Sequence, residues 1–200
     1  MTPDRVLVVA ATAAVCVSSL VSCTGMGVKP TAAHVQSAAT DLQPIIDKAP
    51  YWCDFVPHVA LSRITGLQAA KLTEAKDGWL RDQGLCLVRD TNENGALGID
   101  WSQRDARMTT DLQARRYQQY RPAWLPKLLG YGFAVKSVDN ISNRPYYVIA
   151  AFTCGRAQPW LSIDLRQVAS GRNFVQDLTA LIRIAEQRFG TLHGCSPKPL

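Results

Sequence analysis

The positions of six cysteines constrain what this chain of 200 residues can fold into more than any other feature. Cys16 lies inside an apolar N-terminal run, and Cys23 follows that run directly. The other four are spread over the remaining sequence, at Cys53, Cys86, Cys154 and Cys195. An even number of cysteines in an exported chain is typical of disulfide bonds. The fold therefore depends first on whether the chain is exported.

The N-terminal segment has the features of an export signal. Val6 to Val21 contains no charged residue, and Arg5 stands just before it. A positive residue followed by an apolar run is typical of a signal peptide. A helix that spans a bilayer needs about 20 apolar residues, so a permanent membrane span is the second interpretation of this shorter run. We expect Met1 to Ser22 to be a signal peptide.

The end of the apolar run, Leu20-Val21-Ser22-Cys23, resembles the lipobox of bacterial lipoproteins. The resemblance implies that the signal is cut before Cys23 and that the Cys23 thiol carries diacylglyceryl, with palmitate among its acyl chains. Two acyl chains make a stable anchor, so the mature lipoprotein would stay on the outer face of the cell membrane. An ordinary secretory signal is one alternative. Cys16 is a competing lipidation site, although it lies inside the run and follows the branched Val15.

Cys53, Cys86, Cys154 and Cys195 remain after the anchor, and we expect them to form two disulfides. Four cysteines allow three pairings. We favour Cys53 with Cys86 and Cys154 with Cys195, because each pair then closes a loop of roughly 30 to 40 residues within one half of the domain. The alternative is a metal site, but these cysteines lack the short spacing that zinc sites favour. No metal and no cofactor are expected.

The hydrophobic pattern predicts helices and strands in mixed order. Helices are expected at residues 59–64, 110–120 and 174–189, and strands at 85–90, 96–102, 131–138, 146–153 and 160–166. Gly66 and Gly190 are expected to end the first and last helices, Thr109 or Thr110 to cap the second, and Asn173 to cap the last. The apolar run at 146–153 does not alternate, which is typical of a strand covered on both faces.

These elements predict an α+β fold, an antiparallel sheet with helices packed on one face. We expect a single domain at residues 51–197. Residues 23–50 would contain the lipidated cysteine and a tether. Within the tether, residues 31–48 have the spacing of an amphipathic helix interrupted at Pro44.

The first half of the domain resembles a known group of proteins. Cys53-Asp54-Phe55-Val56 is followed by a short helix that reaches Ile64-Thr65-Gly66, and Cys86 then starts a strand pair. With the lipobox, this arrangement is similar to a family of uncharacterised envelope lipoproteins of actinobacteria, common in mycobacteria and their relatives. The resemblance implies the compartment and the fold. The family has no established activity, so it implies no catalytic residue.

The chain is basic, with a formal net charge of +6, which favours acidic partners. The most suggestive stretch is residues 104–131, where cations alternate with tyrosines and tryptophans. Such side chains together can hold anionic head groups, sugar rings or phosphates. The candidate anion-binding residues are Arg115, Arg116, Arg121 and Lys127. The alternative is an ordinary solvated basic helix face whose aromatic side chains lie in the core.

No catalytic signature is present in the sequence. His34, His58 and His193 are isolated, and no metalloprotease helix, nucleophile elbow or Walker loop occurs. We therefore expect a non-enzymatic envelope protein that binds an amphiphile, an anionic lipid or cell-wall polymer, or a membrane-protein partner, and no nucleic acid. The alternatives are an envelope hydrolase whose site is assembled from distant residues, and a structural accessory subunit of a membrane complex.

Overall fold

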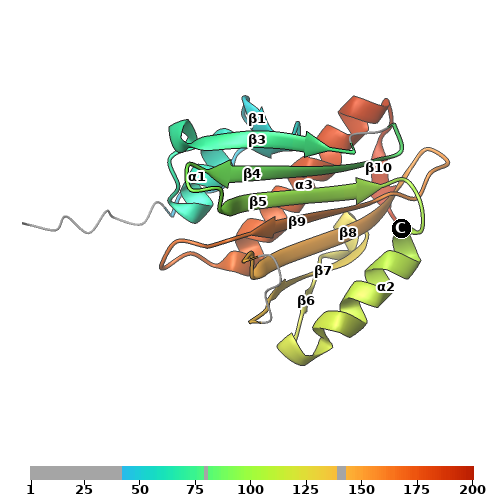
Figure 1. Ribbon diagram of the computed structural model, residues 1–200. Coiled ribbons are helices and arrows are strands. Elements are labelled where there is room, and N and C mark those ends of the chain that lie inside the picture. The colour runs from blue at the N-terminus through green and yellow to red at the C-terminus, as the bar shows by residue number, and fades with distance from the viewer. Residues whose placement is uncertain (1–41, 79–80, 139–142) are drawn as a thin grey trace, which may run out of the picture. The chain divides into compact units, whose positions relative to one another are not determined.

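The computed structural model describes residues 42–78, 81–138 and 143–200 (Figure 1). The expected signal peptide, Cys23 and most of the tether lie outside these residues. In the described part of the chain, one sheet has the strand order β3-β4-β5-β9-β8-β7-β6. Every neighbouring pair is antiparallel. The α+β class and the antiparallel sheet are confirmed.

The strands follow the predicted runs closely. They comprise β3 (Leu72–Asp77), β4 (Gln83–Asp90), β5 (Gly95–Ser102), β6 (Ala123–Trp124), β7 (Tyr131–Lys136), β8 (Tyr146–Cys154) and β9 (Trp160–Leu165). A short last strand, β10 (Pro197–Pro199), pairs with the end of β8 that β7 does not reach. The strands predicted at 85–90 and 96–102 pair as the β4–β5 hairpin, whereas β3 and β6 correspond to no predicted run.

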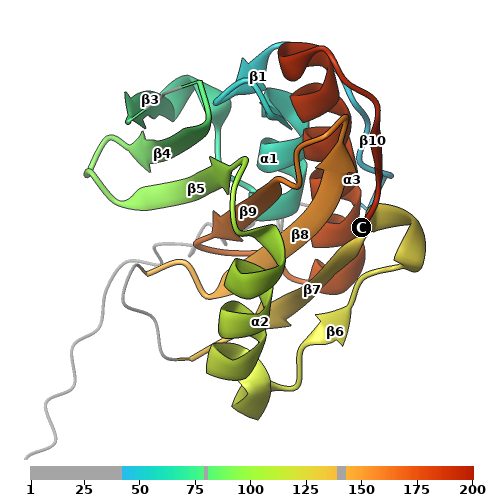
Figure 2. The same ribbon diagram turned by 90° about the vertical axis from the view of Figure 1, so that its right-hand side faces the viewer.

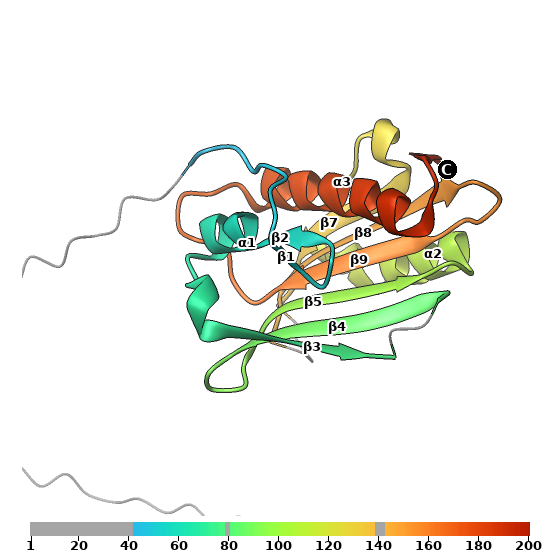
Figure 3. The same cartoon turned by 90° about the horizontal axis from the view of Figure 1, so that it is seen from above.

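The helices described by the structure are divided between the two faces of the sheet. Figure 3 shows α1 (His58–Thr65) and α3 (Phe174–His193) along the same side of the sheet, and Figure 2 shows α2 (Ala106–Tyr117) on the other side of β8 from α3. The helices are therefore not confined to the one face that the sequence had predicted. Alternate residues of a strand point to opposite faces. Accordingly, Ala134 of β7 belongs to the large core with α1 and α3, whereas Phe133 and Val135 form a smaller core under α2. Strands β7 and β8 are apolar on both faces, as predicted for 146–153, and this is why a helix is needed on each side.

The end of α3 differs from the prediction. Asn173 does cap its start, because the Asn173 side chain accepts hydrogen bonds from the backbone N–H groups of Val175 and Gln176. The helix does not end at Gly190 but continues to His193, and Gly194 ends it with a φ of 66°. Gly190 instead provides space, since a Cβ there would lie 2.5 Å from Cδ of Pro197.

Helix α2 begins four residues earlier than predicted. It follows Asp105, which has a φ of 57°, and neither Thr109 nor Thr110 caps it. The Thr110 side chain is buried and faces the sheet. The earlier start adds a full turn to the helix, and this turn contains Met108.

The tether before the domain is extended where the structure describes it. Residues 42–48 form no helix, and the rest of the segment predicted as an amphipathic helix lies outside the described residues. Arg63 of α1 holds this part by donating hydrogen bonds to the Pro44 carbonyl and the Gln43 side chain, at 3.1 and 3.0 Å. Leu42 and Ile46 are 67% and 44% exposed, whereas Ile45 packs against the core. The segment is therefore docked by hydrogen bonds and one apolar side chain, and not by an apolar stripe.

Candidate functional site

Both predicted disulfides are present in the structure. Cys53 is bonded to Cys86 and Cys154 to Cys195, with Cα–Cα separations of 5.9 and 5.4 Å. Disulfides persist in oxidising environments, so the pairs indicate that the domain folds outside the cytoplasm. Among the described residues, no helix has the length and apolar character that crossing a membrane requires.

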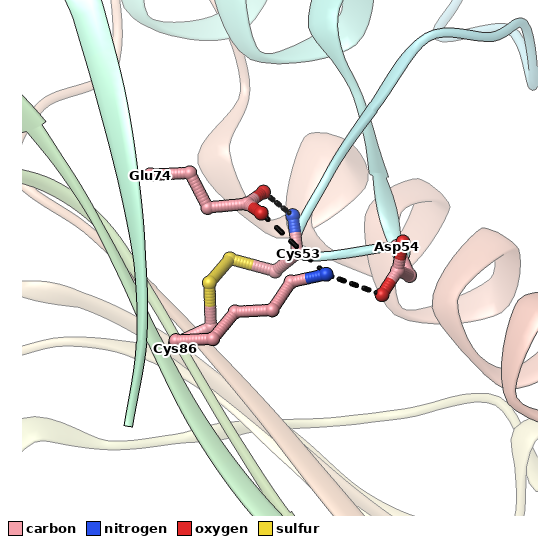
Figure 4. Close-up of a disulfide and its surroundings, with 5 residues drawn as sticks. Cys53, Asp54, Glu74 and Cys86 are labelled. Carbon is pink, nitrogen blue, oxygen red and sulfur yellow. Dashed lines mark hydrogen bonds and ion pairs between the residues drawn. A yellow bond between two sulfur atoms is a disulfide. The ribbon is translucent and has the colours of Figure 1, made fainter. Parts of the chain in front are cut away.

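The first disulfide fixes a tight turn near the start of the domain. Cys53 and Asp54 join β1 (Tyr51–Trp52) to β2 (Val56–Pro57) and have φ values of 54° and 63°. Non-glycine residues rarely adopt such values. Figure 4 shows how the turn is held: the Cys53 N–H donates to the Glu74 carboxylate, and the Lys76 ammonium lies 2.6 Å from the Asp54 carboxylate.

A metal site at this turn does not fit the chemistry of the donors. Cys53, Glu74 and Cys86 place possible ligand atoms close together. However, the two sulfurs are bonded to each other, and zinc binds thiolates. We therefore assign this cluster a structural role, in which the disulfide and the Glu74 carboxylate stabilise the turn.

The exposed side of α2, continued by the start of β6, forms the candidate binding surface, which we call the α2–β6 surface. It consists of Arg107, Met108, Leu112, Arg115, Arg116, Arg121 and Trp124. Met108, Leu112 and Trp124 are 57%, 52% and 56% exposed, although large apolar side chains are more often buried. Met108, Leu112, Arg115 and Arg116 recur at helical spacing, so they share the outward side of α2.

A cleft opens on this surface between α2 and β6. Its volume is about 360 Å³, and it is lined by Ala114, Arg115, Gln118, Pro122 and Trp124. The Trp124 ring stacks on the Tyr131 ring at a centroid distance of 5.6 Å. An arginine and an aromatic ring on opposite sides of one cleft suit a ligand with a negative charge and an apolar body.

The Tyr131 ring is fixed beneath Trp124 by polar contacts. Its hydroxyl donates a hydrogen bond of 2.7 Å to the Asp111 carboxylate, and this bond, with desolvation, raises the pKa of Tyr131. The Arg107 guanidinium lies over the same ring, 5.7 Å from its centroid. Asp111 and Arg107 are therefore both engaged with Tyr131, whereas Arg115, Arg116 and Arg121 are exposed.

The structure brings three of the four candidate residues together. Arg115 and Arg116 are exposed on the last turn of α2, and Arg121 follows the 3-10 turn Gln118–Tyr120, next to Pro122 in the cleft wall. Lys127 is placed elsewhere, in a 3-10 turn that contacts β8 and β10. In Figure 2 this turn, between β6 and β7, lies beside the C-terminus and away from α2.

Two apolar members of the surface, Met108 and Leu112, were not predicted from the sequence. Met108 and Leu112 are separated by four residues, a spacing that places them on one side of a helix. This signal was missed because the helix was expected to start at Thr110, after Met108. Trp124 belongs to the stretch 104–131, but it lies in the two-residue strand β6, where no periodic pattern indicates its exposure.

The histidines that the structure describes are packing residues. His58 stacks on Trp52 at 3.9 Å, and His193 stacks on Phe189 at 4.1 Å. Burial lowers the pKa of both imidazoles, which are therefore neutral at pH 7. His34 lies outside the described residues.

A second cleft lies on the part of the sheet that α2 leaves uncovered. It measures about 270 Å³, and its lining includes Asp77, Leu85, Asp100 and Trp160. Desolvation raises the pKa of Asp100 to about 6, although its side chain can be reached by solvent. This cleft contains no concentration of positive charge, unlike the α2–β6 surface.

Comparisons with models of protein families, with curated proteins and with solved structures found no match. The resemblance to actinobacterial envelope lipoproteins therefore remains an expectation from the sequence motifs. Support for the fold and for the α2–β6 surface comes from the structure of this chain alone.

Proposed function

We propose that this chain is an exported lipoprotein that binds acidic membrane lipid through the α2–β6 surface and performs no catalysis. The observation that supports this proposal is the combination of exposed apolar side chains with four arginines on one side of the molecule. Met108, Leu112 and Trp124 supply the apolar contact. The cations of the surface are Arg107, Arg115, Arg116 and Arg121.

The charges favour a lipid surface because of their number and exposure. A basic side chain near an acidic membrane surface contributes about 1 kcal/mol to binding. Arginine also donates several hydrogen bonds in a geometry that matches phosphate. Arg115, Arg116 and Arg121 are all exposed, so they can approach head groups without rearrangement of the fold.

The apolar residues favour a membrane over a soluble anionic polymer. Helices that lie at the membrane interface combine basic residues with apolar side chains that enter the boundary between head groups and acyl chains. Met108 and Leu112 stand beside Arg115 on the outward side of α2. The cleft beside Trp124 offers further apolar contact next to a positive charge.

The proposed anchor would leave the domain free to turn this surface toward the membrane. Between Cys23 and the first described residue, Leu42, the chain has enough residues to reach about 60 Å when extended. That distance exceeds the diameter of about 30 Å expected of a small domain. A tethered domain also binds at a high effective concentration, so a weak surface interaction suffices.

Binding to vesicles tests the proposal. The protein from Lys29 onward, which lacks the lipid, is sedimented with vesicles of phosphatidylcholine alone or with 30% phosphatidylglycerol. Replacing Arg115, Arg116 and Arg121 with alanine should weaken binding to the acidic vesicles on the order of a hundredfold, because three contributions of about 1 kcal/mol are lost. High salt should weaken wild-type binding as well, since it screens the charges.

A matched triple variant separates this surface from net charge. Lys48, Lys71 and Arg156 are exposed outside the α2–β6 surface, so replacing them with alanine removes the same charge. This control should bind nearly as wild type does. A further variant, Met108→Gln with Leu112→Gln, should lose binding while it keeps every arginine. Equal binding by the two triple variants would refute the assignment of this surface.

A further inference from the structure

The two disulfides differ in their access to solvent. Cys53 and Cys86 are fully buried, at 0% exposure each. Cys154 is 7% exposed and Cys195 is partly buried, and both residues line a pocket of about 180 Å³. Disulfide exchange requires that a thiolate reach a sulfur atom. Among the described residues, the Cys154–Cys195 disulfide is therefore the one with a pocket beside it that a small thiol could enter.

The walls of this pocket are fixed by packing and hydrogen bonds. His193 is stacked on Phe189, and its Nδ1 lies 3.3 Å from the Gln103 amide nitrogen. The same amide nitrogen donates to the Arg81 carbonyl at 3.2 Å. Burial lowers the pKa of His193, so Arg81 is the positively charged residue in the lining of this pocket. A cation beside a disulfide attracts anionic thiols and favours the thiolate form.

We propose that the Cys154–Cys195 bond is an exchange site for a small anionic thiol. The incoming thiolate forms a bond with Sγ of Cys195, the more exposed sulfur. The Cys154–Cys195 bond breaks, and its electron pair stays on Sγ of Cys154, which takes a proton from water. The product is a mixed disulfide at Cys195. A second thiol of the same kind attacks that bond, releases the oxidised small disulfide and leaves both cysteines reduced.

The bond lies where its loss would affect one part of the domain. It ties the end of β8 to the segment after α3, and β10 pairs with β8 directly beside it, with Pro197 opposite Cys154. Exchange would therefore leave the last residues held by the β8–β10 hydrogen bonds and by the packing of Pro197 against Gly190. The Cys53–Cys86 bond is fully buried and would remain closed.

The test exposes the folded wild-type protein to 2-mercaptoethanesulfonate, which is anionic, or to 2-mercaptoethanol, which is neutral, at equal thiolate concentration. After acid quenching and alkylation, peptide mass mapping measures each disulfide over time. We expect a mixed disulfide on Cys195 while Cys53–Cys86 stays intact. The anionic thiol should react about three- to tenfold faster, because the Arg81 charge raises its local concentration.

Three variants make the test specific. Arg81→Gln should remove the preference for the anionic thiol. Arg104→Gln is the matched control, since Arg104 pairs with Asp82 at 2.7 Å and does not line the pocket. Ala157→Leu should slow both thiols by filling the pocket. Equal reaction of the two disulfides in wild type, or an unchanged anionic preference in Arg81→Gln, would overturn the proposal.

Discussion

The carboxyl group of Glu186 is the most unusual single residue in the core. It is 5% exposed, and its Oε1 atom has no hydrogen-bond partner in the structure. Desolvation on burial raises the pKa of Glu186 to about 8, and the positive charge of the nearby Arg183 lowers this pKa by a smaller amount. Gly190, one turn further along α3, touches Pro197, so the chain that follows the helix covers this side of it. The fold accepts a neutral carboxylic acid at this position.

Replacing Glu186 with glutamine should therefore change how stability depends on pH. In wild type the folded pKa lies above the ordinary value of 4.5, so the folded state holds a proton that the unfolded state has lost. Stability then falls as pH rises from about 4.5 to about 8, by up to about 1.4 kcal/mol per pH unit. Glu186→Gln cannot ionise, and its urea-unfolding free energy should be flatter over this range.

The control is Glu93→Gln, because Glu93 is 77% exposed in the β4–β5 turn. It should leave the pH profile nearly unchanged. The expected result is that Glu186→Gln gains stability relative to wild type between pH 5 and pH 8. A difference that stays constant across this range would show that Glu186 is ionised in the folded protein.

Single residues differ in how well the sequence predicts their roles. The pairing of Cys53 with Cys86 could be predicted because few cysteines remain in an exported chain and short loops favour local pairs. The role of Lys127 could not, because a proline-rich stretch contains no periodic signal for the direction of the chain. Lys127 is close to Arg121 in sequence, but the turn at Pro126 leads it to β8 and β10.

Among the elements, those with an apolar face were predicted best. Helix α3 and strands β5 and β9 have clear periods of 3.6 and 2 residues, because each buries one side. Strand β3 was missed, since five of its six residues are exposed and only Leu72 is buried. An edge strand is held by main-chain hydrogen bonds to its neighbour, and these leave no mark in the side-chain pattern.

Gly190 was predicted to end α3, but the structure gives this glycine a different role. A glycine after an apolar stripe is typical of a helix end, but Gly194 fills that role here with its positive φ. Gly190 is required for a different reason, which is the close passage of Pro197 and the Cys195 carbonyl. Long-range contacts of this kind are not visible in local sequence.

Gly190→Ala should therefore destabilise the protein despite the better helix propensity of alanine. Propensity alone would favour the variant by about 1 kcal/mol. However, the new Cβ would lie 2.5 Å from Cδ of Pro197 and 2.7 Å from the Cys195 carbonyl oxygen. Overpacking of a close contact typically costs about 1–3 kcal/mol. Thermal unfolding followed by circular dichroism measures the balance, and a higher melting temperature for Gly190→Ala would contradict the packing argument.

In the whole molecule, the two faces of the sheet differ in the helices and the cores that cover them. The face covered by α1 and α3 contains the large core and the buried disulfide, and the tether at residues 43–44 docks against α1. The opposite face has the small core under α2 and the exposed α2–β6 surface. The fold class could be predicted from the order of elements, but this division could not, since either face of a sheet can accept a helix.

Under the proposed function, the anchor and the α2–β6 surface would make distinct contributions to membrane binding, which predicts how the whole protein behaves in cells. A diacyl group at Cys23 would hold the protein stably at any salt concentration, because each buried methylene contributes about 0.8 kcal/mol. The arginines of the surface contribute a term that salt screens. Cys23→Ala should therefore abolish acyl labelling and cleavage before residue 23. Molecules of this variant from which an ordinary signal peptidase removes the apolar run should keep only residual membrane binding that high salt removes.

Metabolic labelling with palmitate measures acylation at Cys23. Fractionation of membranes at low and high salt measures the contribution of the arginines to membrane binding. The informative comparison adds Arg115→Ala, Arg116→Ala and Arg121→Ala to Cys23→Ala, because this combined variant should lose the residual binding even at low salt. The three arginine changes without Cys23→Ala should leave fractionation unchanged, since two acyl chains suffice. Wild-type labelling of Cys23→Ala would show that the anchor lies elsewhere. Residual binding that resists high salt would instead favour a permanent span formed by Val6 to Val21.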